Sequence, residues 1–354
     1  MKILHVINSM IVGGAETLLR DAITGINLKY PSIEQHLITL YGDGKQLDSI
    51  KDIVKYKNLA VSKINFLLKS IELKKYIKEN DINVVHAHLY DAMILARFAI
   101  PIRVPLFYTY HNGIHNLNST DYSLIRKLID RLTYNKRQYA IFVSKAVETD
   151  ILMGIKIPGP SKVLPNFTSP SFCYSYDINN NNNNLKLVSV GNLRKQKNHE
   201  FSIKVMTLLK DYPVSLDIYG GGLLQKELEK LISDSGANVK LIINCIVNCE
   251  TLSKYDAFFM SSTQEGMSIA VLEAMAVGLP SILSNIDSFL ETAENSALYF
   301  DLENLENSKE QILKIIDNKL LLNKLSQNAE KLSNKYSLDT YLTTLYNLFS
   351  SSLS

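Results

Sequence analysis

The sequence predicts an α/β fold made of two Rossmann-like domains, each a parallel sheet with helices on both faces. Short apolar runs alternate with amphipathic stretches along the 354 residues, and the alternation occurs in both halves of the chain. Strands that are apolar throughout are typical of parallel sheets buried on both sides. The length is sufficient for two such domains.

The candidate strands are rich in Val, Ile, Leu or Phe and are bounded by Gly, Pro, Asn or Asp. In the first half they span residues 3–7, 35–40, 84–88, 106–110 and 140–143. In the second half they span residues 186–190, 215–219, 239–243, 257–260 and 281–284. Helical periodicity between them is clearest in residues 15–26, 66–79, 200–210, 224–235 and 269–277.

An unbroken asparagine run, residues 179–184, marks the domain boundary. It follows Thr168-Ser169-Pro170-Ser171, and polar, turn-forming, low-complexity sequence of this kind is typical of an exposed linker. Helical spacing in residues 320–349 predicts a helical tail. The expected division is a first domain at 1–168, a linker at 169–184, a second domain at 185–335 and a C-terminal segment at 336–354.

The sequence also indicates the cellular compartment in which the protein works. No apolar run approaches the roughly 18 residues that a membrane-spanning helix needs. The first apolar stretch breaks at Asn8-Ser9, which indicates a buried strand rather than a signal peptide. We therefore expect a cytoplasmic protein. The cysteines are few and odd in number, which predicts neither a disulfide framework nor a zinc site; they are Cys173, Cys245 and Cys249.

The net charge of +3 conceals an asymmetry. Up to Thr168 the chain has 22 Lys and Arg against 14 Asp and Glu, whereas the remainder has 16 against 21. A basic first half suits phosphates, an anionic membrane surface or nucleic acid, but scattered surface lysines also explain it. Lysines lie beside an apolar helix face at residues 63–78, and basic residues recur at 126–137. Such helices can lie on anionic lipid, but a solvated face over an apolar stripe that faces the core is the favoured alternative. The scatter of the charge and the lack of a binding motif argue against nucleic acid.

The most informative segment follows the candidate strand 257–260. Gly266 permits a turn, Ser268 is placed to cap the next helix, and Gly278 with Pro280 ends it. This puts Glu265 in a loop and Glu273 within the helix, on either side of a helix N-terminus whose amides suit a diphosphate. Carboxylates beside such a site suit sugar hydroxyls, because they accept several hydrogen bonds. The competing interpretation is a helix cap with a surface glutamate.

A second candidate phosphate site is Gly13-Gly14-Ala15-Glu16, where the first strand passes into a helix. Glycines at such a turn let a phosphate approach backbone amides. Two glycines also occur at many turns for steric reasons alone. The full G-x-G-x-x-G fingerprint is missing, which argues against a simple dinucleotide enzyme.

The segment from Glu265 to Pro280, E-G-M-x-x-x-x-L-E-A-M-A-x-G-x-P, resembles the E-x7-E region of the retaining GT-B glycosyltransferases of "group 1", which are similar to glycosyltransferase family 4. The resemblance extends over nearly the whole chain. It includes Gly13–Glu16, the His-x-His strand 84–88, the histidine segment 108–112, the Pro-Asn stretch 163–166, the basic loop 191–198 and the glycine turn 219–222.

The resemblance implies a GT-B fold whose two domains face each other across a cleft, with a final helix crossing back to the first. The first domain would take the acceptor and the second the nucleotide sugar. Glu273 would bind the ribose, Glu265 the transferred sugar, and Lys197 with Arg194 the leaving diphosphate. His111 would act at the sugar or acceptor. Donor contacts are also expected from Gly13, Gly14, Gly220, Gly266, Met267, Ser268 and Ile269.

Two departures from the family pattern concern the donor. The arginine that often follows the glycine of the basic loop is replaced by Asn192, so Arg194 is the expected substitute. A glycine that is common near residues 241–243 is also replaced, and that loop usually lies close to the base. The base therefore stays open, with uridine favoured and guanosine the alternative.

Histidines raise the question of a metal. His86 and His88 lie two apart on a strand and point the same way, and His111 and His115 follow the next strand. Strand-end histidines are more often satisfied by neighbouring side chains than bound to metal. The sequence also lacks Asp-x-Asp, the feature of metal-dependent sugar transferases of the other fold. We expect no metal and no cofactor besides the nucleotide sugar.

The sequence thus predicts a retaining, metal-independent glycosyltransferase. Its acceptor would be a saccharide or a polyprenyl-linked saccharide in bacterial surface-polysaccharide synthesis. The alternatives are a sugar-nucleotide epimerase of the same fold and a non-catalytic sugar-nucleotide-binding subunit. The presence of Lys197, Glu265 and Glu273 argues against the second alternative.

Overall fold

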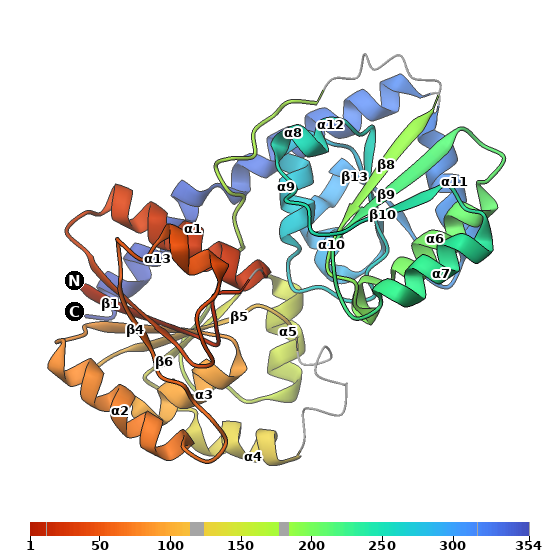
Figure 1. Cartoon of the computed structure of the whole chain (residues 1–354). Helices are drawn as coiled ribbons and strands as arrows, with labels where there is room; N and C mark the ends of the chain where they lie inside the picture. Colours follow the sequence, from red (N-terminus) through yellow and green to blue (C-terminus); the bar gives the residue numbers. More distant parts are fainter. Residues whose placement is uncertain (12, 114–123, 177–183, 317, 354) are drawn as a thin grey trace. The chain divides into compact units, whose positions relative to one another are not determined.

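The computed structural model describes residues 1–354 except 12, 114–123, 177–183, 317 and 354 (Figure 1). His115 and all but Asn184 of the asparagine run therefore lie outside the described residues. The chain forms two compact units. Unit 1 comprises Met1–Phe167 and Leu338–Ser354, and unit 2 comprises Thr168–Ser337. Among the described helices, none is long and apolar enough to cross a membrane.

Unit 1 contains a parallel sheet with the order β3-β2-β1-β4-β5-β6-β7. Its strands are β1 (Lys2–Ile7), β2 (Glu34–Thr39), β3 (Lys55–Asn58), β4 (Val84–His88), β5 (Leu106–Tyr110), β6 (Gln138–Phe142) and β7 (Ser161–Val163). Its helices are α1 (Gly14–Lys29), α2 (Phe66–Glu79), α3 (Tyr90–Ala99), α4 (Leu124–Thr133), α5 (Lys145–Gly154) and α13 (Leu338–Ser351).

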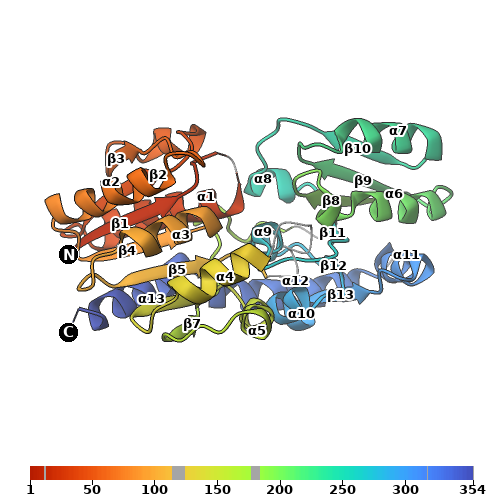
Figure 2. The ribbon, with the colours of Figure 1, turned by 90° about the horizontal axis from the view of Figure 1, so that it is seen from below.

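Helices cover both faces of this sheet, as apolar strands require. Helices α1 and α13 lie on one face, and α2, α3 and α4 lie on the other (Figure 1). Helix α2 packs beside α3 (Figure 2), with Phe66 edge-on to Phe98 at 5.8 Å between ring centroids. Phe349 of α13 packs against Phe107 of β5, so the C-terminal helix completes the core of unit 1.

Unit 2 contains a parallel sheet with the order β10-β9-β8-β11-β12-β13. Its strands are β8 (Leu185–Val190), β9 (Val214–Tyr219), β10 (Val239–Ile242), β11 (Ala257–Met260), β12 (Ser281–Ser284) and β13 (Ala297–Phe300). Its helices are α6 (His199–Leu208), α7 (Gln225–Ser235), α8 (Cys249–Leu252), α9 (Ile269–Val277), α10 (Asp287–Ala293), α11 (Leu305–Ile316) and α12 (Lys319–Ser333). Figure 1 shows α6 and α7 across the sheet from α9 and α12.

The predicted fold class, two parallel sheets with alternating helices, is confirmed. The structure adds detail at the domain boundaries. Residues before the asparagine run pack on unit 2, because the amides of Ser175 and Tyr176 both donate to the carbonyl of Val277. Tyr336 and Ser337 also belong to unit 2. The segment that returns to unit 1 therefore begins at Leu338, two residues later than the expected 336.

Candidate functional site

Three loops of unit 2 lie at the carboxyl ends of adjacent strands. One follows β8, one follows β9, and one joins β11 to α9. Ligands of open α/β sheets bind at this edge. The sequence-predicted donor residues of unit 2 are on these loops or in the first half of α9, so the fold gathers them near one edge of one sheet.

The glycine turn after β9 and the basic loop after β8 pack closely. A Cβ atom on Gly220 would lie 1.9 Å from the carbonyl oxygen of Gly191, and one on Gly222 would lie 2.7 Å from that of Leu193. Only glycine permits this approach. Asn198 ends the basic loop in the left-handed region, with φ of 51°. The two turns thus fix the path of residues 191–198.

A charged pair joins the basic loop to the loop before α9. Lys197 Nζ lies 2.6 Å from Glu265 Oε1, and both side chains are largely buried. Ser262 Oγ donates to the same carboxylate oxygen at 2.8 Å, and Ser284 Oγ donates to the carbonyl of Ser262 at 2.6 Å. The backbone also links the loops, because the amide of Thr263 donates to the carbonyl of Gln196. Lys197 and Glu265 are therefore held in place before any ligand arrives.

The other basic residue predicted in this loop differs in its surroundings. Arg194 is exposed, and among the described residues its guanidinium forms no ion pair. The structure therefore leaves Arg194 able to reorient towards an anion, whereas Lys197 already has a carboxylate partner.

The start of α9 corrects one expectation. Ser268 occupies the N-cap position, but its side chain does not cap the helix. Its hydroxyl instead donates to Met260 Sδ at 3.8 Å, because the residue is buried against β11. The predicted helix end is confirmed: Gly278 is the C-cap in the left-handed region, with φ of 83°. The amides of the first turn therefore lack the side-chain acceptor that a serine cap supplies.

Glu273 lies within α9 and is half-buried among apolar neighbours. Met267 and Ser268, at the preceding turn, are buried, and Ile269 begins the helix. The loop carboxylate and the helix carboxylate thus flank the helix N-terminus, in the order that the sequence indicated.

The predicted residues of unit 1 lie at the carboxyl edge of its own sheet. Gly13 is the N-cap of α1 and Gly14 is its first residue, and the Gly13 carbonyl accepts the first helical bond from Thr17. The backbone of Gly13 is extended, a conformation that any residue adopts, so glycine is not required there by its dihedral angles. His111 follows β5, and its Nε2 lies 3.3 Å from Nδ1 of His88. Burial lowers the pKa of His111 to about 4, which keeps its imidazole neutral at pH 7.

Sequence reasoning missed several residues at these sites. Ser262 and Ser284 orient the Glu265 loop, but serines after strands carry no distinctive spacing. Thr109 Oγ1 lies 2.8 Å from His86 Nε2. His5 lies directly beside His86 on the neighbouring strand, a pairing that depends on the strand order and is invisible in the linear sequence. The expectation that neighbouring side chains satisfy the histidines holds for one ring nitrogen each of His86 and His88. Among the described residues, both ring nitrogens of His5, which the sequence did not single out, lack a hydrogen-bond partner.

Two family models match the chain. "Glycosyltransferase Family 4" matches residues 12–172, and "Glycosyl transferases group 1" matches residues 175–332. The boundary between the two matches coincides with the boundary between the two units to within a few residues.

Individual relatives agree with these matches. The chain is 23% identical over 322 residues to the O-antigen biosynthesis glycosyltransferase WclY of Escherichia coli, covering 86% of each. It is 25% identical over 302 residues to the UDP-Gal:alpha-D-GlcNAc-diphosphoundecaprenol alpha-1,3-galactosyltransferase of Escherichia coli, covering 76% of this chain and 75% of the other. Among solved structures, Anabaena Alr3699/HepE in complex with UDP-glucose superposes with a TM-score of 0.83 at 18% identity, covering 99% and 100% of the two chains.

Proposed function

The chain belongs to the group 1, family 4 glycosyltransferases of the GT-B fold, and from this premise we propose that it transfers a sugar from a UDP-sugar to a saccharide or lipid-linked acceptor with retention of configuration. A GDP-sugar is the alternative donor. UDP-glucose is the ligand named for the HepE structure, and UDP-Gal is named for the galactosyltransferase relative. These names support a uridine donor here.

The observation that carries the proposal is the Lys197–Glu265 pair beside the start of α9. A sugar nucleotide needs a cation for its diphosphate and a hydrogen-bond acceptor for its sugar, separated by a few ångströms. Lys197 supplies the first and Glu265 the second. Arg194 adds a second cation, and the amides of residues 266–269 add donors for diphosphate or sugar. Glu273 accepts hydrogen bonds from the ribose.

In the proposed reaction, the bond between the anomeric carbon and the diphosphate oxygen breaks, and a bond to the acceptor oxygen forms on the same face. The acceptor proton passes to the leaving diphosphate, so the products are the glycoside and UDP. Lys197 and Arg194 stabilise the charge that develops on the diphosphate, which removes the need for a bridging Mg²⁺ or Mn²⁺. His111 orients the sugar or the acceptor hydroxyl.

A lipid-linked acceptor requires contact with a membrane, and α2 has a suitable surface. Ile64 before the helix and Leu67, Leu68 and Ile71 on it are all more than 60% exposed. Exposed lysines flank these side chains; they are Lys63, Lys74, Lys75 and Lys78. Apolar side chains edged by lysines suit the boundary of an anionic membrane. We propose that unit 1 binds peripherally to the inner face of the membrane through α2.

The test of the function is a donor screen followed by product analysis. Thermal shift with UDP, GDP and ADP, and then with their sugars, identifies the base, because a ligand at a hundredfold excess over its Kd stabilises by about 2.7 kcal/mol. The preferred sugar nucleotide is then incubated with saccharide acceptors, and NMR assigns the anomeric configuration of the product. An inverted product would refute retention. Interconversion of the sugar while it is still attached to UDP would indicate an epimerase instead.

The proposed independence of the transfer reaction from metal ions is tested separately, with a chelator. Turnover in EDTA should match turnover without chelator. A loss that Mg²⁺ or Mn²⁺ restores would contradict the role given to Lys197 and Arg194. A loss that only Zn²⁺ restores would leave that role intact and would point to a different site.

A further inference from the structure

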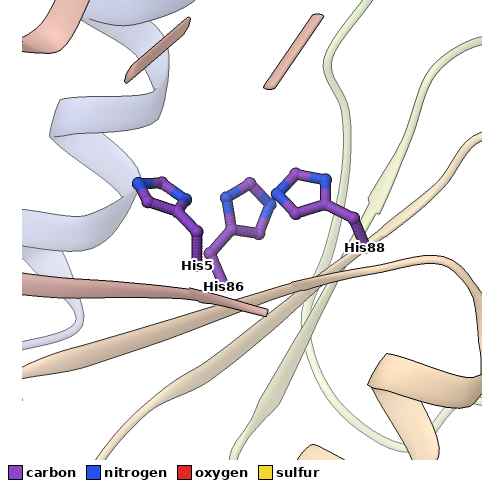
Figure 3. Close-up of side chains that lie close together, drawn as sticks. All are labelled: His5, His86 and His88. Atoms are coloured by element: carbon purple, nitrogen blue, oxygen red, sulfur yellow. The ribbon is translucent and has the colours of Figure 1, made fainter. Parts of the chain in front are cut away.

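Three buried histidines converge on one face of the unit 1 sheet. Strands β1 and β4 are parallel neighbours whose register places His5 opposite His86. His88 is two residues further along β4 and so points to the same face. Figure 3 shows the three rings standing side by side above the two strands. Each residue is at most 3% exposed.

The spacing of the rings is close to that of a metal site. One ring nitrogen from each histidine lies within 4.8 Å of the other two. The ring centroids form a triangle, with sides of 5.9 Å (His5–His86), 6.3 Å (His5–His88) and 4.1 Å (His86–His88). In a tetrahedral zinc site with Zn–N bonds of about 2.0 Å, ligand nitrogens lie about 3.3 Å apart.

The nitrogens in this cluster lack partners. Among the described residues, no hydrogen bond reaches either ring nitrogen of His5, Nδ1 of His86 or Nε2 of His88. The Gln35 side chain lies close enough to His5 to affect its pKa, but without a well-formed hydrogen bond. Buried polar atoms in proteins are nearly always paired, so four unpaired imidazole nitrogens in one place indicate an occupant that binds nitrogen lone pairs.

The space available limits that occupant. The histidines line a cavity of about 10 Å³ together with His111, Asn166 and Tyr341. This volume holds a single ion or a single water molecule and excludes a sugar or a nucleotide. The described lining residues include no carboxylate. Imidazole ligands favour Zn²⁺ and similar transition-metal ions, whereas Mg²⁺ and Ca²⁺ require oxygen ligands.

We propose that His5, His86 and His88 bind one divalent transition-metal ion of the Zn²⁺ class. Burial lowers the pKa of all three imidazoles, so they are neutral at pH 7, as ligands must be. The ion ties β1 to β4 and fixes the ring of His88, the hydrogen-bonded neighbour of His111. This site does not depend on the proposed sugar transfer.

The experiment measures metal directly in the full-length chain, purified without a polyhistidine tag. Metal content is determined by plasma mass spectrometry after dialysis, and the apoprotein is titrated with Zn²⁺ and with Co²⁺. We expect one Zn²⁺ per chain, a tetrahedral-type Co²⁺ absorption band and a rise in Tm on adding Zn²⁺. His5→Gln and His86→Gln should each weaken Zn²⁺ binding at least 100-fold, with circular dichroism verifying that the variants fold.

Two controls make the result specific. His199→Gln changes a histidine of unit 2 that is equally buried and also unpaired at both ring nitrogens, so its metal content should equal that of the wild type. Cys173→Ser with Cys249→Ser removes the thiol pair whose sulfurs lie 3.9 Å apart, and it should also retain the Zn²⁺. Binding that survives both His5→Gln and His86→Gln would overturn the proposal. So would a wild-type chain with no Zn²⁺ and no Tm response, a result that would assign the cavity to water.

Discussion

A single substitution at Glu273 tests the proposed donor site. Its carboxylate is half-buried in α9, where a solvated surface role would leave it exposed. Glu273→Ala should weaken UDP binding by about 10- to 100-fold, because a hydrogen bond to a charged acceptor contributes about 1.5–3 kcal/mol. Calorimetry with UDP measures the loss. Glu227→Ala, the same change on exposed α7 of the same unit, is the matched control and should bind normally. Unchanged affinity in a folded Glu273→Ala variant would remove Glu273 from the site.

His111 makes a different residue-scale test, because it is expected to act in transfer and not in nucleotide binding. Its Nε2 faces His88, which leaves Nδ1 for a substrate group. His111→Gln should lower kcat by about 10²–10⁴-fold, the usual effect of losing a positioned acid–base or orienting group. UDP affinity and Tm should change little. His36→Gln, another buried histidine of the same sheet, controls for nonspecific damage. Parallel losses of Tm and kcat in His111→Gln would indicate a structural role only.

At the scale of elements, the buried central strands and the helices with clear periodicity were predictable, whereas three of the four edge strands were not. The bounds of α9 were predicted at 269–277 because Gly278 and Pro280 end it, and they are confirmed. Strands β3, β7 and β13 were missed. All three are short edge strands with partly exposed residues, and β3 and β7 also lack an apolar run. The Lys197–Glu265 contact was also beyond prediction from spacing, because it depends on β8 and β11 being neighbours.

The contact between α3 and α4 provides the element-scale prediction. Arg97 Nη1 lies 2.5 Å from Asp130 Oδ1 with both side chains buried, and the guanidinium also stacks 3.7 Å from the Tyr134 ring. Asp130→Ala should lower stability by about 3–5 kcal/mol, because it leaves a buried cation unpaired. Urea unfolding followed by circular dichroism measures the change.

An exposed ion pair supplies the comparison for Asp130→Ala. Glu200 and Lys204 on α6 pair at 2.6 Å with about half of each side chain exposed, so Glu200→Ala should cost less than about 1 kcal/mol. Replacing both buried partners, as Arg97→Met with Asp130→Leu, should recover much of the loss. If Asp130→Ala and Glu200→Ala lower the free energy of unfolding equally, Arg97 and Asp130 do not form the buried ion pair described here.

For the molecule as a whole, buried neutral histidines predict an acid-sensitive fold. Among the described residues, burial lowers the pKa of six histidines, and unit 1 contains five of them; they are His5, His36, His86, His88, His111 and, in unit 2, His199. When the chain unfolds, each pKa returns towards 6.5, so the unfolded state binds more protons below that pH. Stability is therefore full above pH 6.5 and falls as pH falls towards 4. A Zn²⁺ ion on the same imidazoles would steepen this dependence in the same direction.

Calorimetric scans between pH 7.5 and 5 measure how the Tm depends on pH, in a range above that in which the carboxylates titrate. The pKa of Glu34 is lowered from 4.5 to about 2 by its hydrogen bond to Lys55, so the stability it supplies is lost only below about pH 4.5. Each buried histidine should cost on the order of 1 kcal/mol by pH 5, and unit 1 should lose more than unit 2. His86→Gln should flatten the pH dependence of the unit 1 transition, and His199→Gln should flatten only that of unit 2. A Tm that stays level or rises from pH 7.5 to 5 would contradict the neutral state of these histidines, since imidazoles already charged in the folded state would take up no further protons on unfolding.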